Sequence, residues 1–270
     1  ACGGAAAPAA EEAPAAEEAP AAEEAPAAEE PGETEGPAPA ASGDTLAAVM
    51  ERGHVICGGN ASVPGFGYVD EEGNYAGFDI DYCKAVAAAV FGDADAYEVR
   101  PLSSQERFTA LQSGEIDVLI RNTTWTLSRD TDLGSNFTAT TFYDGQGFIV
   151  RKADGIEILE DLEGGTVCVQ TGTTTEANLA DVMAARGISY EPVVFEDVET
   201  GWTTYEEGRC DAYTTDKSGL VSRRTLLTVP DDHVIMDETI SKEPLGPVVR
   251  HGDDQWYDIV QWTVFATLFA

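Results

Sequence analysis

Three polar stretches hold most of the residues that could bind a small charged ligand. They are R-N-T-T-W-T-L-S-R-D at 121–130, Q-T-G-T-T-T-E at 170–176 and T-T-D at 214–216. Arg129 can pair two guanidinium N–H groups with both oxygens of a carboxylate. Asp216 only accepts hydrogen bonds and therefore suits an ammonium group. A ligand with both a carboxylate and an ammonium group would match this set.

Each of these residues also has a purely structural interpretation. Arg129 could be a solvated surface charge, and Asp216 could be the N-cap of a helix. Thr173 and Glu176 have the spacing of a capping box, and Gly172 before them marks a loop that opens a helix. Free N–H groups at such a helix start also favour an anion. The ligand-site interpretation is preferred because the two halves of the chain have a similar order of elements.

The hydrophobic pattern predicts two α/β halves. In the first half we expect helices at 45–52, 79–90 and 107–113 and strands at 54–57, 97–100 and 116–121. In the second half we expect helices at 174–186 and 198–207 and strands at 166–170, 190–195 and 210–215. Gly114 aligns with Gly208, and Asp117 with Asp211. Because open α/β sheets bind ligands beyond the carboxyl ends of their strands, the polar stretches are expected to line a cleft between the halves.

Further local signals surround these halves. Asp44 is the expected cap of the first helix, and 103–106 (S-S-Q-E) forms a capping box for the third. Segments 143–152 and 245–250 are predicted hinge strands, whose glycines can absorb backbone rotation. The apolar segment 254–270 is predicted to be a helix that is too short to span a bilayer.

Four segments are specific enough to indicate a family. They are R-N-T-T-W-T-L-S-R-D, V-C-V-Q-T-G-T-T-T-E, G-R-C-D-A-Y-T-T-D and I-S-K-E-P-L-G-P. From about Thr45 onward the chain resembles the amino-acid-binding proteins of ABC importers (solute-binding protein family 3), and among them the general L-amino-acid-binding periplasmic proteins. The resemblance implies an α/β, two-lobed periplasmic-binding-protein fold of type II. Each lobe is then a mostly parallel sheet flanked by helices, and two hinge strands join the lobes.

The resemblance also implies domain boundaries. Lobe 1 is expected at 44–147 and lobe 2 at 148–244, with a return to lobe 1 at 245–270. Since relatives continue beyond this point, we expect the sequence to be truncated.

The resemblance further implies roles in binding a free amino acid. Arg129 would grip the α-carboxylate, helped by backbone N–H groups of Thr124 and of Thr173 or Thr174. Asp216 would bind the α-ammonium together with the Thr124 hydroxyl and the Asn122 carbonyl. The full expected ligand-binding set is Val63, Phe66, Asn122, Thr123, Thr124, Arg129, Gly172, Thr173, Thr174 and Asp216.

Other residues near the expected cleft leave selectivity open. Val63 stands where many relatives carry an aromatic residue and Phe66 is the nearest ring, which is compatible with a roomy, tolerant pocket. Trp125 either walls the cleft or packs beneath the Arg129 loop as core, and the second interpretation is preferred. Three hinge residues are further candidates to face the cleft, namely Tyr143, Asp144 and Gln146.

Cysteine usage suggests an oxidising compartment. Cys57 and Cys83 lie in the first half and Cys168 and Cys210 in the second. A disulfide within each half fits, although four cysteines allow three pairings and four buried thiols are the alternative. No C-x-x-C motif or histidine cluster accompanies them, so no metal or cofactor is expected. The three histidines, His54, His233 and His251, are interpreted as structural or exposed.

The N-terminus predicts a membrane tether. Ala1-Cys2 is typical of a processed lipoprotein, whose cysteine carries the lipid, although an ordinary cysteine is the alternative. Four repeats of A-P-A-A-E-E follow, and residues 1–43 are too rich in Ala, Pro and Glu to form a core. We therefore expect an exported protein, periplasmic or at the cell surface, anchored through Cys2.

Charge excludes one class of partner. The chain has 49 acidic against 15 basic residues, a net charge of −34, which argues against nucleic acid. The expected function is a monomeric, non-enzymatic receptor that binds a broad range of free L-amino acids and delivers them to the permease of an ABC importer. One alternative is a cyclic-carboxylate dehydratase on the same scaffold, with Glu176 as the candidate general acid. The other alternative is the ligand-sensing domain of a receptor.

Overall fold

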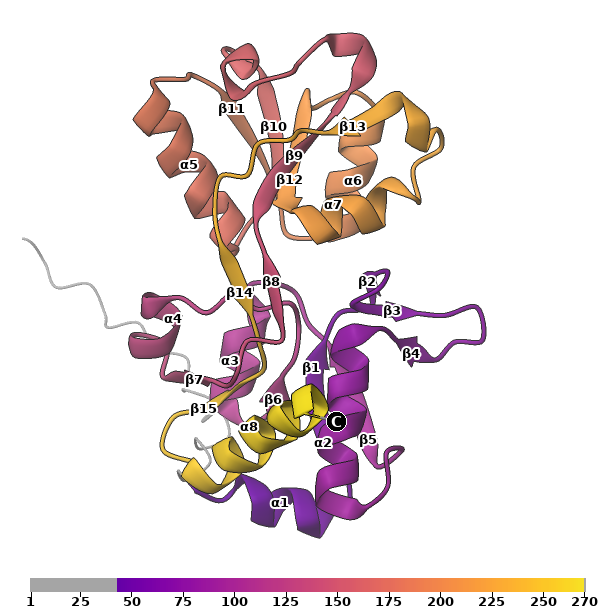
Figure 1. Ribbon diagram of the computed structural model, residues 1–270, viewed down its shortest axis with the longest axis vertical. Helices are drawn as coiled ribbons and strands as arrows, with labels where there is room; N and C mark the ends of the chain where they lie inside the picture. Colours follow the sequence, from indigo (N-terminus) through magenta and orange to yellow (C-terminus); the bar gives the residue numbers. More distant parts are fainter. Residues whose placement is uncertain (1–42, 270) are drawn as a thin grey trace, which may run out of the picture. The chain divides into compact units, whose positions relative to one another are not determined.

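The protein is described by a computed structural model that covers residues 43–269 (Figure 1). The predicted Cys2 anchor and nearly all of the predicted tether lie outside the described residues. Two five-stranded sheets organise the described part, with strand orders β5-β1-β6-β15-β7 and β11-β10-β12-β9-β13. We call the part built on the first sheet lobe 1 and the part built on the second sheet lobe 2.

The lobe 1 sheet has four strands in one direction and one reversed. β1 pairs in parallel with β5 and β6, and β15 runs antiparallel to both β6 and β7. Its strands are β1 (Val55–Gly59), β5 (Tyr97–Pro101), β6 (Val118–Leu119), β7 (Ser135–Phe137) and β15 (Val248–Arg250). Its helices are α1 (Thr45–Arg52), α2 (Phe78–Phe91), α3 (Glu106–Ser113), α4 (Leu127–Thr131) and α8 (Asp254–Phe269).

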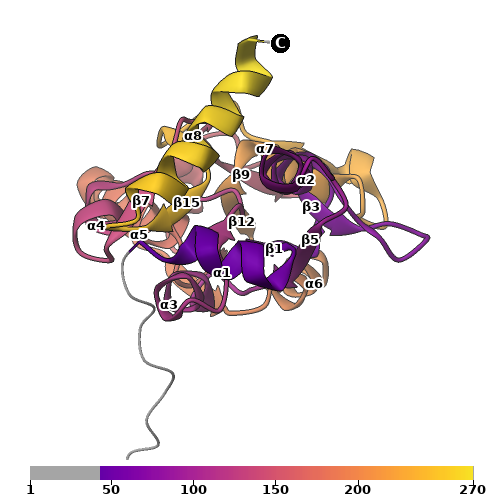
Figure 2. The ribbon, with the colours of Figure 1, turned by 90° about the horizontal axis from the view of Figure 1, so that it is seen from below.

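Two apolar layers hold the lobe 1 helices on its sheet. On one face the core includes Val86 of α2, Val118 of β6 and Trp256 of α8. On the other face Phe108 and Leu111 of α3 pack with residues of β6, β7 and β15. Seen from below, α1, α2 and α8 lie together (Figure 2), and α8 packs against both other helices. The chain therefore returns to lobe 1 after it has built lobe 2.

Lobe 2 repeats this plan. β10 pairs in parallel with β11 and β12, while β9 runs antiparallel to β12 and β13. Its strands are β9 (Gln146–Arg151), β10 (Thr166–Gln170), β11 (Glu191–Phe195), β12 (Ala212–Asp216) and β13 (His233–Ile235). Its helices are α5 (Thr174–Arg186), α6 (Val198–Glu206) and α7 (Lys217–Arg224), with short 3-10 turns at Lys152–Asp154, Leu159–Leu162 and Pro230–Asp232. The leucine and methionine side chains of α5 cover one face of the sheet, and Trp202 and Tyr205 of α6 cover the other.

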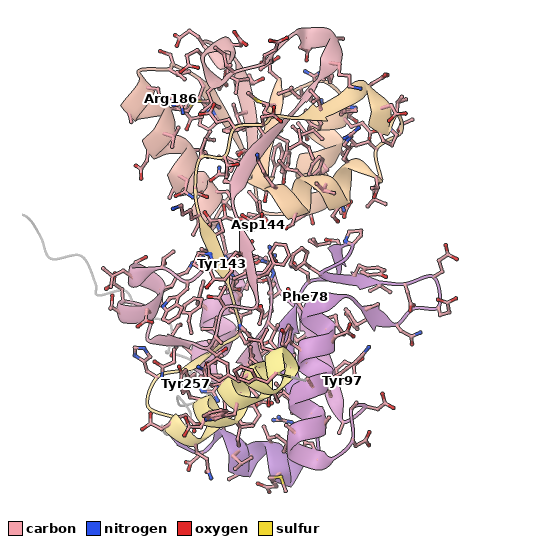
Figure 3. All side chains as sticks on the ribbon, viewed as in Figure 1. Phe78, Tyr97, Tyr143, Asp144, Arg186 and Tyr257 are labelled. Carbon is pink, nitrogen blue, oxygen red and sulfur yellow. A yellow bond between two sulfur atoms is a disulfide. The ribbon has the colours of Figure 1, made fainter. Side chains whose placement is uncertain are left out.

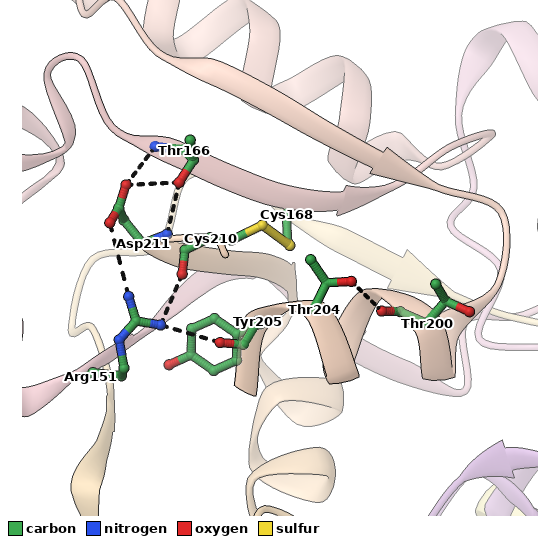
Figure 4. Close-up of a disulfide and its surroundings, with 8 residues drawn as sticks. All are labelled: Arg151, Thr166, Cys168, Thr200, Thr204, Tyr205, Cys210 and Asp211. Carbon is green, nitrogen blue, oxygen red and sulfur yellow. Dashed lines mark hydrogen bonds and ion pairs between the residues drawn. A yellow bond between two sulfur atoms is a disulfide. The ribbon is translucent and has the colours of Figure 1, made fainter. Parts of the chain in front are cut away.

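Asp117 and Asp211, which align in the sequence, make equivalent hydrogen bonds in the two lobes. The Asp211 carboxylate accepts from the Thr166 N–H at 2.7 Å, and Arg151 donates to the carbonyls of Tyr205 and Cys210 (Figure 4). In lobe 1 the Asp117 carboxylate accepts from the Ile56 N–H at 2.7 Å. There Arg250 donates to the carbonyls of Leu111 and Ile116. In both lobes the aspartate of the repeated helix-glycine-strand unit therefore accepts a hydrogen bond from a neighbouring strand, and an arginine bonds two carbonyls of the same unit.

Two antiparallel strands connect the lobes. β8 (Phe142–Asp144) pairs with β14 (Glu243–Leu245), and this pair lies between the two large sheets (Figure 1). β8 continues into β9 of lobe 2, and β14 leads into β15 of lobe 1. The predicted hinge strands are therefore present, each divided into a hinge part and a sheet part. A small sheet of β2 (Ser62–Val63), β3 (Gly67–Val69) and β4 (Tyr75–Ala76) completes lobe 1.

Both predicted disulfides are confirmed. Cys57 is bonded to Cys83 and joins β1 to α2, while Cys168 is bonded to Cys210 and closes a separation of 42 residues in lobe 2. Figure 4 shows the second disulfide beside Tyr205 and the Arg151 hydrogen bonds. Each disulfide lies within one lobe, so neither one ties the two lobes together.

Some local predictions need correction. Asp44 makes no side-chain cap hydrogen bond to α1; the N–H of Thr45, the first residue of this helix, donates to Asp253 at 3.1 Å. β6 spans only Val118–Leu119 and is shorter than the predicted strand at 116–121, because ladder pairing with β1 and β15 is limited to these two residues. The capping box before α3 is present, with Ser103 and Glu106 exchanging two hydrogen bonds. In residues 43–269 no helix combines the length and apolar character that a membrane crossing requires.

Candidate functional site

A cavity lies where the carboxyl ends of the parallel strands of both lobes meet. Its free volume is about 680 Å³, including the open mouth. Lobe 1 contributes Asn60, Val63, Phe66, Ser104, Arg107, Arg121, Asn122, Thr124 and Arg129. Lobe 2 contributes Gln170, Thr173, Thr174, Thr175, Val198, Trp202, Tyr213, Thr215, Asp216, Ser218, Gly219 and Arg223. Eight of the ten residues in the expected ligand-binding set line it.

Arg129 is a buried cation in the wall from lobe 1. The short helix α4 carries it, and the Thr126 hydroxyl caps this helix by accepting from the Arg129 N–H. The guanidinium Nη1 donates to the Thr124 carbonyl at 2.9 Å, and the side chain is 7% exposed. Burial lowers the pKa of Arg129 to about 10, while Glu243 and Asp216 raise it, so the group is charged at neutral pH. It can bind a carboxylate that enters the cavity.

Asp216 faces the cavity from lobe 2. It ends β12 directly before α7, yet its side chain makes no cap hydrogen bond, so the simple N-cap interpretation does not apply. Its Oδ1 is buried without a partner among the described residues. Burial, with contributions from Asp144 and Glu243, raises the pKa of Asp216 to about 8, against the lowering effect of Arg107 and Arg129. A buried acceptor that lacks a donor is what a bound ammonium group would satisfy.

The start of α5 adds an anion-binding feature. Thr173 is its N-cap, and its hydroxyl accepts from the Glu176 N–H at 3.1 Å. The first N–H groups of any helix lack partners within that helix, and Thr174 and Thr175 of this first turn line the cavity. The hydroxyls of Thr124 and Thr174 lie 3.4 Å apart, one from each lobe. The start of α5 in lobe 2 therefore lies next to Thr124 of lobe 1, which comes shortly before the helix that carries Arg129.

Asn122 holds the end of β6 in an unusual conformation. Its φ is +33°, and it is the one non-glycine residue of the described chain with positive φ. Its N–H donates to Asp79 at 2.7 Å and its Oδ1 accepts from Asn60 at 2.6 Å. Burial raises the pKa of Asp79 to about 7, although the Asn122 N–H and Arg121 both lower it. Such local strain is typical of a functional turn that its surroundings stabilise.

Three arginines that were not among the predicted ligand-binding residues also line the cavity. Arg223 pairs with Glu199 through two contacts of 2.5 and 2.6 Å. Arg121 donates to the Leu102 carbonyl at 2.8 Å and to the Ser104 hydroxyl at 3.2 Å. Arg107 lies on α3 and is 3% exposed. Arg121 ends the strand predicted at 116–121 and Arg107 begins the helix predicted at 107–113, whereas Arg223 lies in α7, a helix that was not predicted from the sequence.

A buried hinge carboxylate was also missed. Glu243 of β14 is 2% exposed and accepts from the Thr174 hydroxyl at 3.1 Å and the Asn178 amide at 2.8 Å. The Ser241 hydroxyl also donates to it. Glu243 therefore orients the Thr174 hydroxyl, although it does not itself line the cavity.

Several predicted residues lie outside the cavity wall. Thr123 is fully buried and donates to the Arg121 carbonyl, and Gly172 lies against Gln105. Trp125 stacks on Phe137 with its ring centroid 5.8 Å away, but it is 44% exposed, so it neither walls the cavity nor belongs to the core. The indole of Trp125 stacks on the buried Phe137 but remains partly open to solvent itself.

The three hinge candidates do not line the cavity either. Tyr143 and Asp144 lie on β8 (Figure 3), where Tyr143 is 81% exposed and Asp144 accepts from the Ser218 hydroxyl. Gln146 is buried and donates to the Thr175 carbonyl and the Thr214 hydroxyl, both at 2.9 Å. Asp144 and Gln146 thus support residues next to the cavity from behind.

Comparisons with known proteins agree on one family. The family model for bacterial extracellular solute-binding proteins, family 3, matches residues 55–267. The general L-amino acid-binding periplasmic protein AapJ of Rhizobium johnstonii is 57% identical over 233 residues, which are 86% of this chain and 68% of that protein. The glutamate/glutamine/aspartate/asparagine-binding protein BztA of Rhodobacter capsulatus is 54% identical and covers 86% of this chain and 69% of its own length.

A solved structure is also similar. The periplasmic binding protein from Brucella ovis with glutathione bound is 53% identical, with a TM-score of 0.79 over 82% of this chain and 69% of that chain. The family match, the sequence identity and the shared fold all point the same way. The chain belongs to the bacterial extracellular solute-binding proteins of family 3.

Proposed function

We propose that this protein is an extracytoplasmic receptor that binds free L-amino acids in the cavity and delivers them to the permease of an ABC importer. The observation that supports this most is that Arg129 and Asp216 line the same buried cavity. Each lies close enough to shift the pKa of the other, and Asp216 Oδ1 has no partner among the described residues. A zwitterionic α-amino acid supplies the missing anion and cation at once.

The relatives support the same ligand class. AapJ is named for general L-amino acids and BztA for glutamate, glutamine, aspartate and asparagine, while the Brucella protein was solved with glutathione. We further propose a periplasmic or cell-surface location, a Cys2 lipid anchor and a monomeric state. The binding set of this proposal is Val63, Phe66, Asn122, Thr124, Arg129, Thr173, Thr174 and Asp216, each of which lines the cavity. Thr123 and Gly172 are proposed to support it from behind.

A ligand screen by thermal shift tests the proposal. The panel contains the twenty amino acids, glutathione and several cyclic carboxylates. Ligand at a hundredfold its Kd adds about 2.7 kcal/mol to the free energy of unfolding, which for lobes of this size means a rise in Tm of several degrees. Shifts with one or more L-amino acids would support the receptor, and no shift with any of them would reject it.

The role of Arg129 can be tested directly. We expect Arg129→Met to lose most binding of every amino acid, because a charge-assisted pair contributes roughly 1.5 to 3 kcal/mol and the ligand carboxylate would be left unpaired in a buried cavity. Calorimetry on Arg209→Met provides the control, since Arg209 is exposed and this variant changes the net charge equally. Affinity of Arg129→Met within threefold of the unmodified protein would exclude the role.

The dehydratase alternative has less support from the site. Glu176 accepts from the Gly172 N–H at 2.9 Å and from the Thr171 hydroxyl at 3.1 Å, and it does not line the cavity. Its position is thus accounted for by the start of α5. Thermal shifts with cyclic carboxylates alone, together with turnover of one of them, would replace the receptor by this alternative.

A further inference from the structure

Arg107 is a deeply buried cation with weak polar partners. It extends from α3, is 3% exposed and lines the cavity. Nη1 lies 3.4 Å from the Thr123 hydroxyl and Nη2 lies 3.5 Å from the Gly172 carbonyl, both at the outer limit for a hydrogen bond. Its Nε has no partner in residues 43–269. A guanidinium so poorly satisfied away from water is costly to bury.

The charges around Arg107 do not balance it. Among the described residues no carboxylate forms an ion pair with it, whereas Arg223 is paired with Glu199. Burial lowers the pKa of Arg121 to about 10, although the nearby Asp79 raises it in part. Burial lowers the pKa of Arg107 well below its usual value, and Arg129 and Arg121 lower it further, while Asp216 alone raises it. The cavity therefore holds a cation for which the protein provides no dedicated anion.

Arg107 is also close to the proposed α-carboxylate site. The guanidinium carbons of Arg107 and Arg129 each lie 5.2 Å from the centroid of the Phe108 ring. The two carbons are therefore no more than twice that distance apart. One small molecule with two carboxylates can reach both guanidinium groups.

We infer that Arg107 forms a second anion subsite, which binds the side-chain carboxylate of an acidic amino acid while Arg129 and Asp216 hold its α-carboxylate and ammonium. The inference depends on the proposed function and specifies its preferred ligand class. Arg223 forms an ion pair with Glu199, and Arg121 lies near Asp79 and donates to the Leu102 carbonyl and the Ser104 hydroxyl. The charged groups that remain for a ligand are Arg107, Arg129 and Asp216. A dicarboxylic amino acid matches them with two negative charges and one positive. A neutral amino acid leaves Arg107 without a counter-ion.

Glutamate and glutamine provide the matched test, because they have the same shape and differ in charge. Calorimetry on the full chain should show L-glutamate binding about ten- to a hundredfold tighter than L-glutamine, the effect of one buried charge-assisted contact. Arg107→Met should reduce this ratio to within threefold, mainly by weakening glutamate. Arg107→Lys should restore part of the ratio, and Arg209→Met on the surface should leave it unchanged. Melting curves confirm that each variant is folded.

The outcomes separate this inference from the proposed function. If the unmodified protein binds glutamine as tightly as glutamate, the second subsite is excluded while the receptor stands, and this result needs no variant. If Arg107→Met weakens both ligands equally, Arg107 supports the fold of the site and does not read the side chain, which also overturns the inference. If no amino acid binds at all, the receptor proposal fails first.

Discussion

The buried charges of the cavity are balanced by a ligand better than by the protein itself. Asp216 is the clearest case, since burial, Asp144 and Glu243 raise its pKa to about 8 in spite of two nearby arginines. An ammonium group beside its free Oδ1 would favour the ionised form. The free protein therefore keeps a proton on this carboxyl at neutral pH, and ligand binding should remove it.

We predict that amino-acid affinity rises with pH up to about 8. The sign follows from the raised pKa of Asp216. Below about pH 8 the carboxyl of the free protein is protonated, and it must release this proton before it can bind an ammonium group. Kd should therefore increase by up to about tenfold for each unit by which the pH falls. The same shift makes the ligand-free protein less stable as pH rises from 3.8 toward 8, because the folded state holds its proton longer than the unfolded chain. Calorimetry in buffers of different ionisation enthalpy measures the released proton directly.

Asp216→Asn is the control for this pH dependence. The amide cannot titrate, so its weaker binding should be independent of pH between about 6 and 8, well below the pKa of a ligand amino group and above that of ordinary carboxyls. Equal proton release by Asp216→Asn and by the unmodified protein would assign the effect to another group, with Asp79 the first to consider because burial raises its pKa to about 7.

At the scale of elements, contacts between the lobes on two sides of the cavity matter most. On one side, α7 of lobe 2 meets the β2–β3 segment of lobe 1, where Ser222 donates to the Pro64 carbonyl at 2.6 Å and Arg223 to the Ser62 carbonyl at 2.9 Å. On the other side Gln105 donates to the Thr171 hydroxyl at 3.2 Å. There a Cβ on Gly172 would come within 2.8 Å of the Gln105 side chain, so only glycine allows this approach. These contacts exist only while the lobes are together.

We predict that Ser222→Ala speeds ligand release. Ser222 does not line the cavity, so the change removes one contact between the lobes without touching the ligand. One neutral hydrogen bond contributes about 0.5 to 1.5 kcal/mol, which corresponds to a two- to tenfold faster dissociation in stopped-flow measurements. Thr225→Ala is the matched control, because within residues 43–269 that hydroxyl bonds only the Ser222 carbonyl, three residues back in the chain. If both variants release ligand at the same rate, the α7 contact does not hold the closed arrangement.

An element could be predicted from the sequence when the residues that determine it are neighbours in the chain. Helix α5 has the predicted bounds because Thr173 caps its start and Gly187 its end, both signals of neighbouring residues. The Arg129 and Asp216 positions followed from a motif at strand ends. Arg107 could not be found in this way, since a lone arginine on an amphipathic helix has the pattern of a surface charge. It becomes a cavity residue only because lobe 2 covers that end of α3.

At the scale of the whole molecule the dominant feature is negative charge. Residues 44–270 hold 39 acidic against 15 basic residues, a net charge of −24. Most ion pairs among the described residues include at least one solvent-exposed side chain, and such pairs contribute little. Like charges spread over a compact surface repel one another, and the repulsion is weaker in the expanded unfolded chain. The folded protein should therefore gain stability whenever this repulsion is screened.

We predict that Tm rises by several degrees when NaCl is increased from about 0.1 to about 1 M, because the Debye length shortens from about 10 to about 3 Å. A charge variant separates screening from general salt effects. Glu71 and Glu72 lie exposed in the turn between β3 and β4, and neither takes part in an ion pair or side-chain hydrogen bond among the described residues. Glu71→Lys/Glu72→Lys should raise Tm at low salt and reduce the gain from added NaCl. A double variant that melts lower than the unmodified protein at low salt, with the same response to NaCl, would show that repulsion across the surface does not limit stability.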